Sequence, residues 1–466
     1  MKQLLGFLGI LAILAALSTS ETGCANIVPP SGGLRDSIPP VLVKATPRDS
    51  STRFEGKTIN LVFDEFVQVD NFSQNVIISP LPRVLPGQTS KLNTISVRLR
   101  DSLEANTTYT INFGNSIKDI NEGNVMKEFT YVFSTGPYID SLTLSGSVIL
   151  AETGQTDTTL TVMLHRSSDD SAIVKEKPRY VTKLDSKGRF VFHNLPPGRF
   201  YLYALKDESR TYLYRSTRTL FAFADSVVNL RSGLDSIRLY AYQADKTSPG
   251  GFGSSATGGK PGEKRLRYQT SIRQPAKTQD ILQPFFFSFD KPLKLFDSSR
   301  VHFSTDSSFT PVTGYSWKYE GKKISLLYPW KPNTIYHLVL DKDFATDSLN
   351  QQLLRPDTIS FTTLGRDDYA RLTLRFRNLE LKNNPVLQFV QNSEVVTAFP
   401  LTGEKFTREQ FSPGEYQLRI LYDANQNGKW DPGEFFGKHR QPEIVRPIER
   451  QLNIKAAIEN DVEIIL

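Results

Sequence analysis

The sequence of 466 residues is poor in the side chains that carry most enzyme chemistry. It has one cysteine and five histidines, and it contains neither a G-x-S-x-G nucleophile motif nor an H-E-x-x-H zinc motif. The histidines have no metal-ligand spacing, and we expect them on strand or loop surfaces: His165, His193, His302, His337 and His439. A single cysteine excludes an intrachain disulfide. We therefore predict a protein that is not an enzyme.

Long apolar runs are missing after the first residues of the chain. The one such run, from Leu4 to Leu17, follows Lys2 and is followed by small and polar residues up to Gly23. This run is shorter than the roughly 20 residues of a membrane-spanning helix, and its flanks are typical of a secretory signal peptide. We predict that residues 1–23 are cleaved and that everything after them lies outside the membrane.

Cys24 directly follows this predicted signal peptide. It resembles the lipid-modified cysteine of a bacterial lipoprotein, although Glu21 stands where the usual motif has an aliphatic residue. The Pro/Gly/Ser-rich stalk at 24–38 resembles those of Bacteroidota envelope lipoproteins. The resemblance implies lipidation at Cys24 and an outer-membrane location, facing either the periplasm or the surface. A free thiol in an uncleaved anchor helix is the alternative.

The chain is moderately basic, and its one basic cluster, Lys260, Lys264, Arg265 and Arg267, falls in a linker, where a solvated tether is expected. Lysine and arginine number 56 against 49 aspartate and glutamate residues, and they are scattered singly among the acidic residues. This pattern is typical of a solvated surface, and no nucleic-acid-binding motif is present. We expect no nucleic-acid partner.

Residue usage and periodicity favour β-structure throughout the mature chain. Aromatic residues make up 11% of the sequence, and 27 prolines and 29 glycines are distributed between short Thr-, Val- and Ile-rich runs. In 58–63, Ile59, Leu61 and Phe63 alternate with Asn60 and Val62, which predicts a half-buried strand. We expect an all-β protein.

Two internal repeats organise the chain. The segment beginning at Phe406 recurs without a gap 216 positions earlier, with eight matching residues. In the later copy these are Phe406, Phe411, Pro413, Gly414, Tyr416, Leu418, Ile420 and Asp423. In the earlier copy they are, in the same order, Phe190, Leu195, Pro197, Gly198, Phe200, Leu202, Ala204 and Asp207. A second set of matches, at offsets of 226 to 228, includes Asn106 with Asn333, Tyr109 with Tyr336, and Asp119 with Asp347. The turn after Asp347 lacks the glycine found after Asp119, so we expect a different loop there.

These repeats resemble two known families. The ordered strings F-D-E, I-S-P, N-T-T-Y, D-I-N-E-G-N and F-S-T-G in 39–137 resemble a bacterial Ig-like domain of the S-layer-protein type. The strings L-S-G-S-V, D-S-K-G-R-F and L-P-P-G between 144 and 198 resemble a prealbumin-like, or carboxypeptidase-regulatory-like, sandwich. The resemblance implies tandem β-sandwiches in alternation, with these boundaries: Ig-like domains at 39–137 and 269–365, prealbumin-like sandwiches at 138–243 and 366–466, and a flexible linker at 244–268.

The segment 423–434 fits the twelve-residue calcium-loop pattern D-x-[DN]-x-[DN]-G-x₅-E. Oxygen atoms at the first, third, fifth, seventh, ninth and twelfth positions wrap one hard cation, and Gly428 permits the sharp turn. The predicted ligands are Asp423, Asn425, Asn427, the carbonyl of Lys429, Asp431 and Glu434. We expect strands rather than helices beside it, and a structural role for any bound Ca²⁺. An Asn/Asp/Gly turn closed by its own hydrogen bonds is the alternative.

The sequence thus predicts a non-catalytic, lipid-anchored envelope protein that serves as a structural or protein-binding scaffold in an outer-membrane assembly. A glycan-binding protein is the alternative, because Trp317, Trp330 or Trp430 can stack on sugar rings. Core or rim packing of these tryptophans is the competing interpretation. The expected partners are the membrane, through the anchor, and envelope proteins or glycans.

Overall fold

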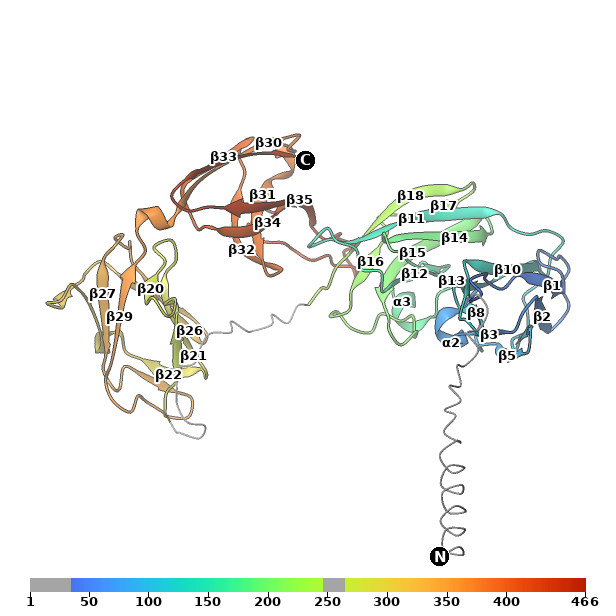
Figure 1. Ribbon diagram of the computed structural model, residues 1–466, viewed down its shortest axis with the longest axis horizontal. Coiled ribbons are helices and arrows are strands. Elements are labelled where there is room, and N and C mark those ends of the chain that lie inside the picture. The colour runs from blue at the N-terminus through green and yellow to red at the C-terminus, as the bar shows by residue number, and fades with distance from the viewer. Residues whose placement is uncertain (1–34, 246–264) are drawn as a thin grey trace, which may run out of the picture. The chain divides into compact units, whose positions relative to one another are not determined.

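A computed structural model describes residues 35–245 and 265–466. These residues form two compact units, 35–142 with 193–196 and 143–192 with 197–466. Nearly all regular structure is β, as expected (Figure 1). No helix in the described part of the chain is long and apolar enough to span a membrane. Cys24, the signal peptide and most of the predicted stalk and linker lie outside the described residues.

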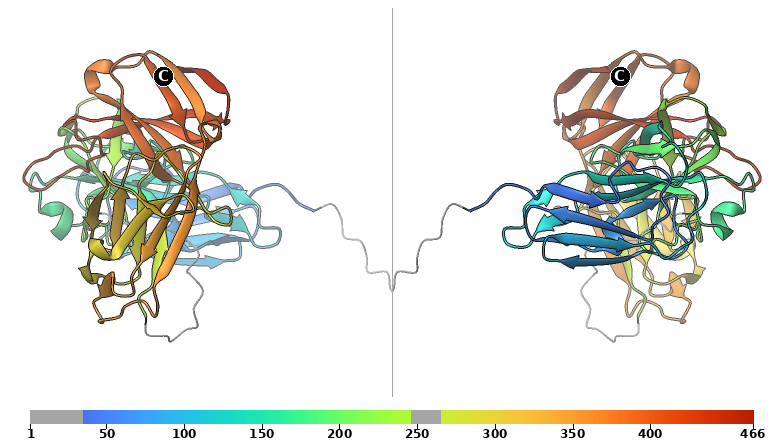
Figure 2. Two further views of the ribbon diagram at one scale, coloured as in Figure 1. Left: turned by 90° about the vertical axis from the view of Figure 1, so that its left-hand side faces the viewer. Right: turned by 90° about the vertical axis from the view of Figure 1, so that its right-hand side faces the viewer.

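The first unit is built from short strands in stacked layers, seen in blue in Figure 2. Its sheets have the orders β1-β2-β6-β5, β10-β7-β4 and β3-β8-β9. Phe63, Phe113, Tyr131 and Phe133 are almost fully buried between them. The elements are β1 (Leu42–Thr46), β2 (Thr58–Phe63), β3 (Val67–Val69), α2 (Phe72–Asn75), β4 (Ile77–Ser79), β5 (Gly87–Lys91), β6 (Thr94–Arg98), β7 (Thr108–Gly114), β8 (Ile117–Asp119), β9 (Val125–Met126) and β10 (Phe129–Ser134).

The second unit begins with a sandwich, here called the first sandwich, which comprises residues 143–192 and 197–245. Its sheets have the orders β14-β11-β18 and β13-β12-β15-β16, and β17 also pairs with β15. The elements are β11 (Leu142–Leu150), β12 (Leu160–His165), α3 (Ala172–Lys175), β13 (Tyr180–Lys183), β14 (Arg189–Leu195), β15 (Gly198–Lys206), β16 (Phe221–Phe223), β17 (Val228–Leu230) and β18 (Leu234–Ala241).

The middle module follows at 265–365, with sheets β19-β21-β26-β25 and β20-β29-β27-β23-β24 around a Phe-rich core. Its elements are β19 (Tyr268–Thr270), β20 (Thr278–Gln279), β21 (Phe285–Phe289), β22 (Leu293–Phe296), η1 (Ser298–Arg300), β23 (Val301–Thr305), β24 (Thr310–Pro311), β25 (Ser316–Glu320), β26 (Lys323–Leu327), β27 (Ile335–Leu340), β28 (Ala345–Asp347) and β29 (Asp357–Thr363).

The C-terminal sandwich, residues 366–466, has two layers, β33-β30-β36 and β32-β31-β34-β35 (Figure 1). Phe389, Leu418 and Ile420 are buried between them. The elements are η2 (Arg366–Asp368), β30 (Ala370–Arg377), η3 (Leu381–Asn383), β31 (Pro385–Gln391), β32 (Glu394–Pro400), β33 (Lys405–Phe411), β34 (Gly414–Tyr422), β35 (Ile444–Ile454) and β36 (Glu459–Ile465).

The 216-residue repeat is visible in the backbone. Strands β14 and β33 begin and end 216 positions apart, and so do β15 and β34. Gly198 and Gly414, which open β15 and β34, both have φ of +147°, a conformation that favours glycine. Each sandwich also has a parallel strand pair at one sheet edge, β11 with β18 and β30 with β36. The two sequences therefore specify the same local structures.

The loops after Asp119 and Asp347 differ as expected. Both aspartates are buried, and their carboxylates accept backbone N–H groups of the following turn. In the first loop the Asp119 amide donates to Asn124, whereas the Asp347 amide donates to Gln351, so the second loop is one residue shorter. Asn350, at φ +58°, supplies the left-handed position in that shorter turn.

Candidate functional site

The predicted calcium loop lies in a long excursion between two neighbouring strands. Tyr422 at the end of β34 pairs with Ile444 at the start of β35, so the chain leaves the sheet after Tyr422 and returns to the same point. Residues 423–443 between them, called the excursion below, have only an isolated bridge, between Glu434 and Arg440. The flanking elements are strands, so the loop has no EF-hand helices.

The first turn of the excursion closes around Asp423, which is 1% exposed. Its carboxylate accepts the amides of Gly428 at 2.6 Å and Asn427 at 3.2 Å, and Gly428 has φ of +75°. Asp207, the matching residue of the first sandwich, likewise accepts the amide of Tyr212, which corresponds to Gly428, and it also accepts the amide of Ser209. Because that turn lacks the calcium pattern, side-chain hydrogen bonding alone closes this kind of turn.

Several of the predicted ligands come together. The amides of Asn425 and Asn427 donate to the same Asp431 carboxylate oxygen, at 2.6 and 2.7 Å. Glu434 lies elsewhere, because its carboxylate bonds Lys438 at 3.0 Å. Lys429 contributes its backbone amide, which donates to the Asn427 side chain at 2.7 Å.

A residue outside the twelve-residue pattern, Glu443, joins this group. Its side chain is 8% exposed and accepts the amides of Ala424 at 2.8 Å and Asp431 at 3.0 Å. Burial raises the pKa of the Glu443 carboxyl, and the nearby charges of Asp423 and Asp431 raise it further. Sequence reasoning missed Glu443 because it is the last residue of the excursion, nine positions beyond the twelve-residue pattern.

The donor set fits a hard cation only in part. Three carboxylates and two amides surround the base of the excursion, which is the oxygen-rich chemistry that Ca²⁺ prefers. Within the described ranges, however, no three His, Cys, Asp or Glu side chains are arranged to hold a metal. A cation here would therefore require the amide oxygens of Asn425 and Asn427, whose amide nitrogens now face Asp431.

The second half of the excursion packs on the first sandwich. Phe435 is 5% exposed, and its ring centroid lies 5.1 Å from Phe223, 5.3 Å from Phe221 and 5.6 Å from Tyr203. These rings belong to the sheet formed by β12, β13, β15 and β16. Phe435 thus fills an apolar surface that the first sandwich would otherwise leave open to water.

Polar contacts surround this aromatic anchor. Gln441 Nε2 donates to the Phe223 carbonyl at 3.0 Å, and His439 Nε2 lies 2.7 Å from an Asp170 carboxylate oxygen. Beyond the excursion, the Val445 amide donates to the Ala151 carbonyl at 2.8 Å. An apolar centre with a hydrogen-bonded rim is the usual anatomy of a specific interface.

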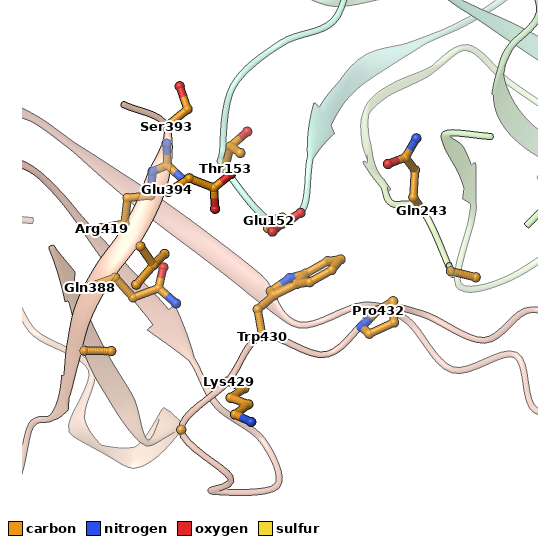
Figure 3. A pocket seen from close by; sticks show the side chains of 14 residues that line it. Glu152, Thr153, Gln243, Gln388, Ser393, Glu394, Arg419, Lys429, Trp430 and Pro432 are labelled. Atoms are coloured by element: carbon orange, nitrogen blue, oxygen red, sulfur yellow. The ribbon is translucent and has the colours of Figure 1, made fainter. Parts of the chain in front are cut away.

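A cleft of about 520 Å³ lies beside this contact. Figure 3 shows Arg419 and Gln388 projecting from the C-terminal sandwich, with Glu152 and Thr153 entering from the first sandwich. Trp430 forms part of the wall, and its indole nitrogen donates to the Glu443 carbonyl at 2.7 Å. Along β34, Arg419 alternates with the core residues Leu418 and Ile420, a pattern typical of an exposed polar side chain. In the structure Arg419 is only 5% exposed.

The remaining sequence candidates do not form a site. Trp330 is buried in the core of the middle module, and Trp317 packs against that core between Phe287 and Phe296. His165, expected at the surface, is 2% exposed at the end of β12, because the sheet covers it. Burial lowers the pKa of its imidazole to about 4.

Comparison with known proteins identifies one domain. The model of a bacterial Ig-like domain family matches residues 36–135, which is the segment that resembles such a domain in sequence. A search of curated proteins finds no match.

Solved structures give only distant likenesses. The TIE protein of Bacillus anthracis is 11% identical over 94% of this chain and 75% of its own, with a TM-score of 0.16. BcpA, the major pilin subunit of Bacillus cereus, is 8% identical over 69% of this chain and 99% of its own, with a TM-score of 0.17. The N-terminal part of the bacterial S-layer protein SbsC is 14% identical over 42% of each chain, with a TM-score of 0.15. Similarity at this level carries no conclusion about function.

Proposed function

We propose that this chain is a non-catalytic, lipid-anchored protein of the cell envelope that acts as a structural and protein-binding scaffold in an outer-membrane assembly. The observation that carries the proposal is the coupling of its sandwiches. Phe435 and its polar rim join the C-terminal sandwich to the first sandwich across the middle module and the 246–264 segment. Such coupling holds the first and C-terminal sandwiches in a defined relation, which a scaffold needs and a flexible chain of domains lacks.

The anchor is proposed from the sequence. Cys24 follows an apolar segment with signal-peptide character, and the acyl chains of a modified cysteine hold a protein on a membrane at about 0.8 kcal/mol per buried CH₂. The bacterial Ig-like match at 36–135 supports a bacterial chain in which folded β-domains begin shortly after this anchor. The side of the outer membrane on which they lie decides between periplasmic and surface partners.

Glycan binding has weaker support than protein binding. A sugar-stacking site needs an exposed aromatic face, and Trp330 is 8% exposed. Trp317 has neighbours on two sides, Phe287 and Phe296. Trp430 packs beside Val386, Leu421 and Val445. These three tryptophans therefore serve packing first.

We further propose that the base of the excursion binds Ca²⁺ in a structural role. Asp423, Asn425, Asn427 and Asp431 would hold the ion with the Lys429 carbonyl, and Glu443 takes the position that the sequence pattern gave to Glu434. The support is electrostatic. Burial and the charges of two neighbouring carboxylates raise the pKa of the Glu443 carboxyl. A divalent cation would relieve the repulsion between these carboxylates. Bound calcium would stiffen the base from which Phe435 reaches the first sandwich.

The proposed anchor is tested by metabolic labelling of cells with a fatty acid that carries a clickable tag. Wild-type chain should incorporate label, and Cys24→Ala should not. Protease treatment of the same intact cells then shows on which side of the outer membrane the protein lies. Protection of the protein indicates the periplasm, and its digestion indicates the cell surface. Equal labelling of wild type and Cys24→Ala, or none in either, would refute the lipid anchor.

A further inference from the structure

Arg419 is a buried cation with no hydrogen-bond partner in the described ranges. It lies on the outer face of β34 and is 5% exposed, and Glu152 is the charged residue that acts on its guanidinium. Removing an ion from water costs several kcal/mol unless hydrogen bonds replace its hydration. Because the described residues supply no such hydrogen bond, the charge calls for an explanation other than stability.

The neighbours of Arg419 form the floor of the cleft. In the register of the sheet, Ala398 of β32, Gln388 of β31, Arg419 of β34 and Pro447 of β35 lie in one row. Gln388 is also 5% exposed, and its side-chain amide has no hydrogen-bond partner within 35–245 and 265–466. Two buried side chains with unused N–H donors therefore line one cavity of about 520 Å³ (Figure 3).

The duplicated sandwich shows that the fold does not require a cation at this position. Tyr203 occupies the place of Arg419, 216 positions earlier, on β15. Phe435 covers Tyr203, and both rings are buried. The first sandwich thus closes this face with aromatic packing, whereas the C-terminal sandwich keeps an open cleft with a charge at its floor.

From these observations we propose that the cleft binds a peptide through its carboxylate, with Arg419 and Gln388 as the groups that hold it. A planar guanidinium matches a carboxylate with two parallel N–H donors, and the Gln388 amide supplies a further donor. The inference rests on the protein-binding role proposed above and gives that role a site and a ligand class.

The charges around the cleft favour a carboxylate over a phosphate. Glu152 and Glu394 line the cleft along with Arg419 and Lys429, so the wall is close to neutral. Burial lowers the pKa of the Arg419 guanidinium, and the Glu152 charge partly offsets this effect. A monoanion balances one buried guanidinium, whereas a dianionic phosphate would meet two carboxylates at close range.

The shape of the cleft favours a peptide as the bearer of that carboxylate. Its volume lies in the range that holds ligands of a few residues. Strand β32 is at the edge of its sheet and supplies Glu394, Val395 and Ala398 to the lining. Edge strands recognise extended peptides through unpaired backbone groups, and the Trp430 wall offers apolar surface to a side chain.

The test uses the full-length chain in detergent and a fluorescein-labelled pool of random hexapeptides with free carboxyl termini. Fluorescence polarisation should show saturable binding, and the same pool with amidated termini should bind at least ten-fold more weakly. Arg419→Met should abolish binding, and Arg419→Lys should weaken it about ten-fold, because an ammonium cannot donate in the same bidentate way. The control is Arg446→Met, which removes an exposed arginine of the neighbouring strand β35. This variant should bind the peptides like wild type.

A stability measurement separates a binding role from a structural one. If Arg419 serves binding, Arg419→Met should unfold at the same denaturant concentration as wild type or at a higher one, because a buried charge without a hydrogen bond has been removed. Equal binding of free and amidated peptides, unchanged binding by Arg419→Met, or displacement by inorganic phosphate at lower concentration than by acetate would overturn the proposal. Peptide binding that fails while cross-linking in membranes still captures protein partners would refute this site and leave the scaffold role standing.

Discussion

The ring of Phe435 stands edge-on to the ring of Tyr203, with centroids 5.6 Å apart and planes at 87°. The two residues belong to different sandwiches and are separated by the whole middle module. Their contact places a side chain from a polar excursion in an aromatic cluster of the first sandwich, so Phe435 is the aromatic anchor of the coupling.

Phe435→Ala should release this coupling. Removing a buried phenyl ring typically costs about 3 kcal/mol or more. We expect faster cleavage of the excursion in limited proteolysis and an earlier unfolding transition of the C-terminal sandwich in urea. The comparison is Phe436→Ala, because Phe436 is 45% exposed and meets the first sandwich by stacking on Tyr214 at 6.2 Å, so its loss should change the transition less, by about 1 kcal/mol. Equal effects of the two variants would contradict the anchor role.

Gly154→Ala should disturb the interface between the first and C-terminal sandwiches through a steric clash. Gly154 has φ of +69°, and a Cβ atom there would lie 2.2 Å from Cδ of Pro447 in the C-terminal sandwich. Gly321→Ala is the control, since Gly321 has φ of +61° and open space around it, so it measures backbone strain alone. We expect Gly154→Ala to cost about 1 to 3 kcal/mol beyond the control in urea unfolding. The same loss in both variants would show that the sandwiches do not meet here.

Acid should destabilise the first sandwich through His165. Its pKa is about 4 in the folded chain against an ordinary value of 6.5, so the unfolded state binds the proton more readily. The stability contributed by the neutral imidazole is complete above pH 6.5 and falls as the pH drops toward 4, by about 3 kcal/mol in all. Urea titrations at several pH values should show this slope. His165→Phe should flatten it, and an unchanged slope in that variant would assign the acid sensitivity to other groups.

Calcium should stabilise the C-terminal sandwich. An ion at one hundred times its dissociation constant adds about 2.7 kcal/mol. We expect a higher Tm with Ca²⁺ than with EGTA, and no calcium response in Asp423→Asn. Asp207→Asn is the control: it weakens the matching turn of the first sandwich, which lacks the pattern, and should leave the calcium response intact. A Tm that is independent of Ca²⁺ in the wild type would favour the alternative of a turn closed only by its own hydrogen bonds.

Much of the local structure was predictable from the sequence. Strand alternation around Ile59, the 216-residue repeat and the changed loop after Asp347 all depend on neighbours along the chain or on simple periodicity. The bacterial Ig-like match at 36–135 confirms the resemblance carried by the short strings of that segment. Such features are specified locally, so they can be predicted without knowing which modules are in contact with one another.

The contacts between modules were not predictable in this way. Alternation with Leu418 and Ile420 favours an exposed Arg419, yet the side chain is buried at a cleft that residues of the first sandwich also line. Phe435 and Phe436 look alike in sequence, and only the position of the first sandwich makes one an anchor and leaves the other exposed. Glu443 joins Asp423 because β35 returns beside β34, which a twelve-residue pattern does not record. The one sequence signal that could have indicated the contact of Phe435 was its position among polar residues.

The most direct test of the scaffold role is cross-linking in intact cells, followed by purification of the chain from solubilised membranes under denaturing conditions. Wild-type chain should yield discrete, reproducible protein adducts. Cys24→Ala should lose them, because a chain without its anchor no longer stays at the membrane. A wild-type chain that is labelled at Cys24 and yields no protein adduct under these conditions would contradict the proposed role.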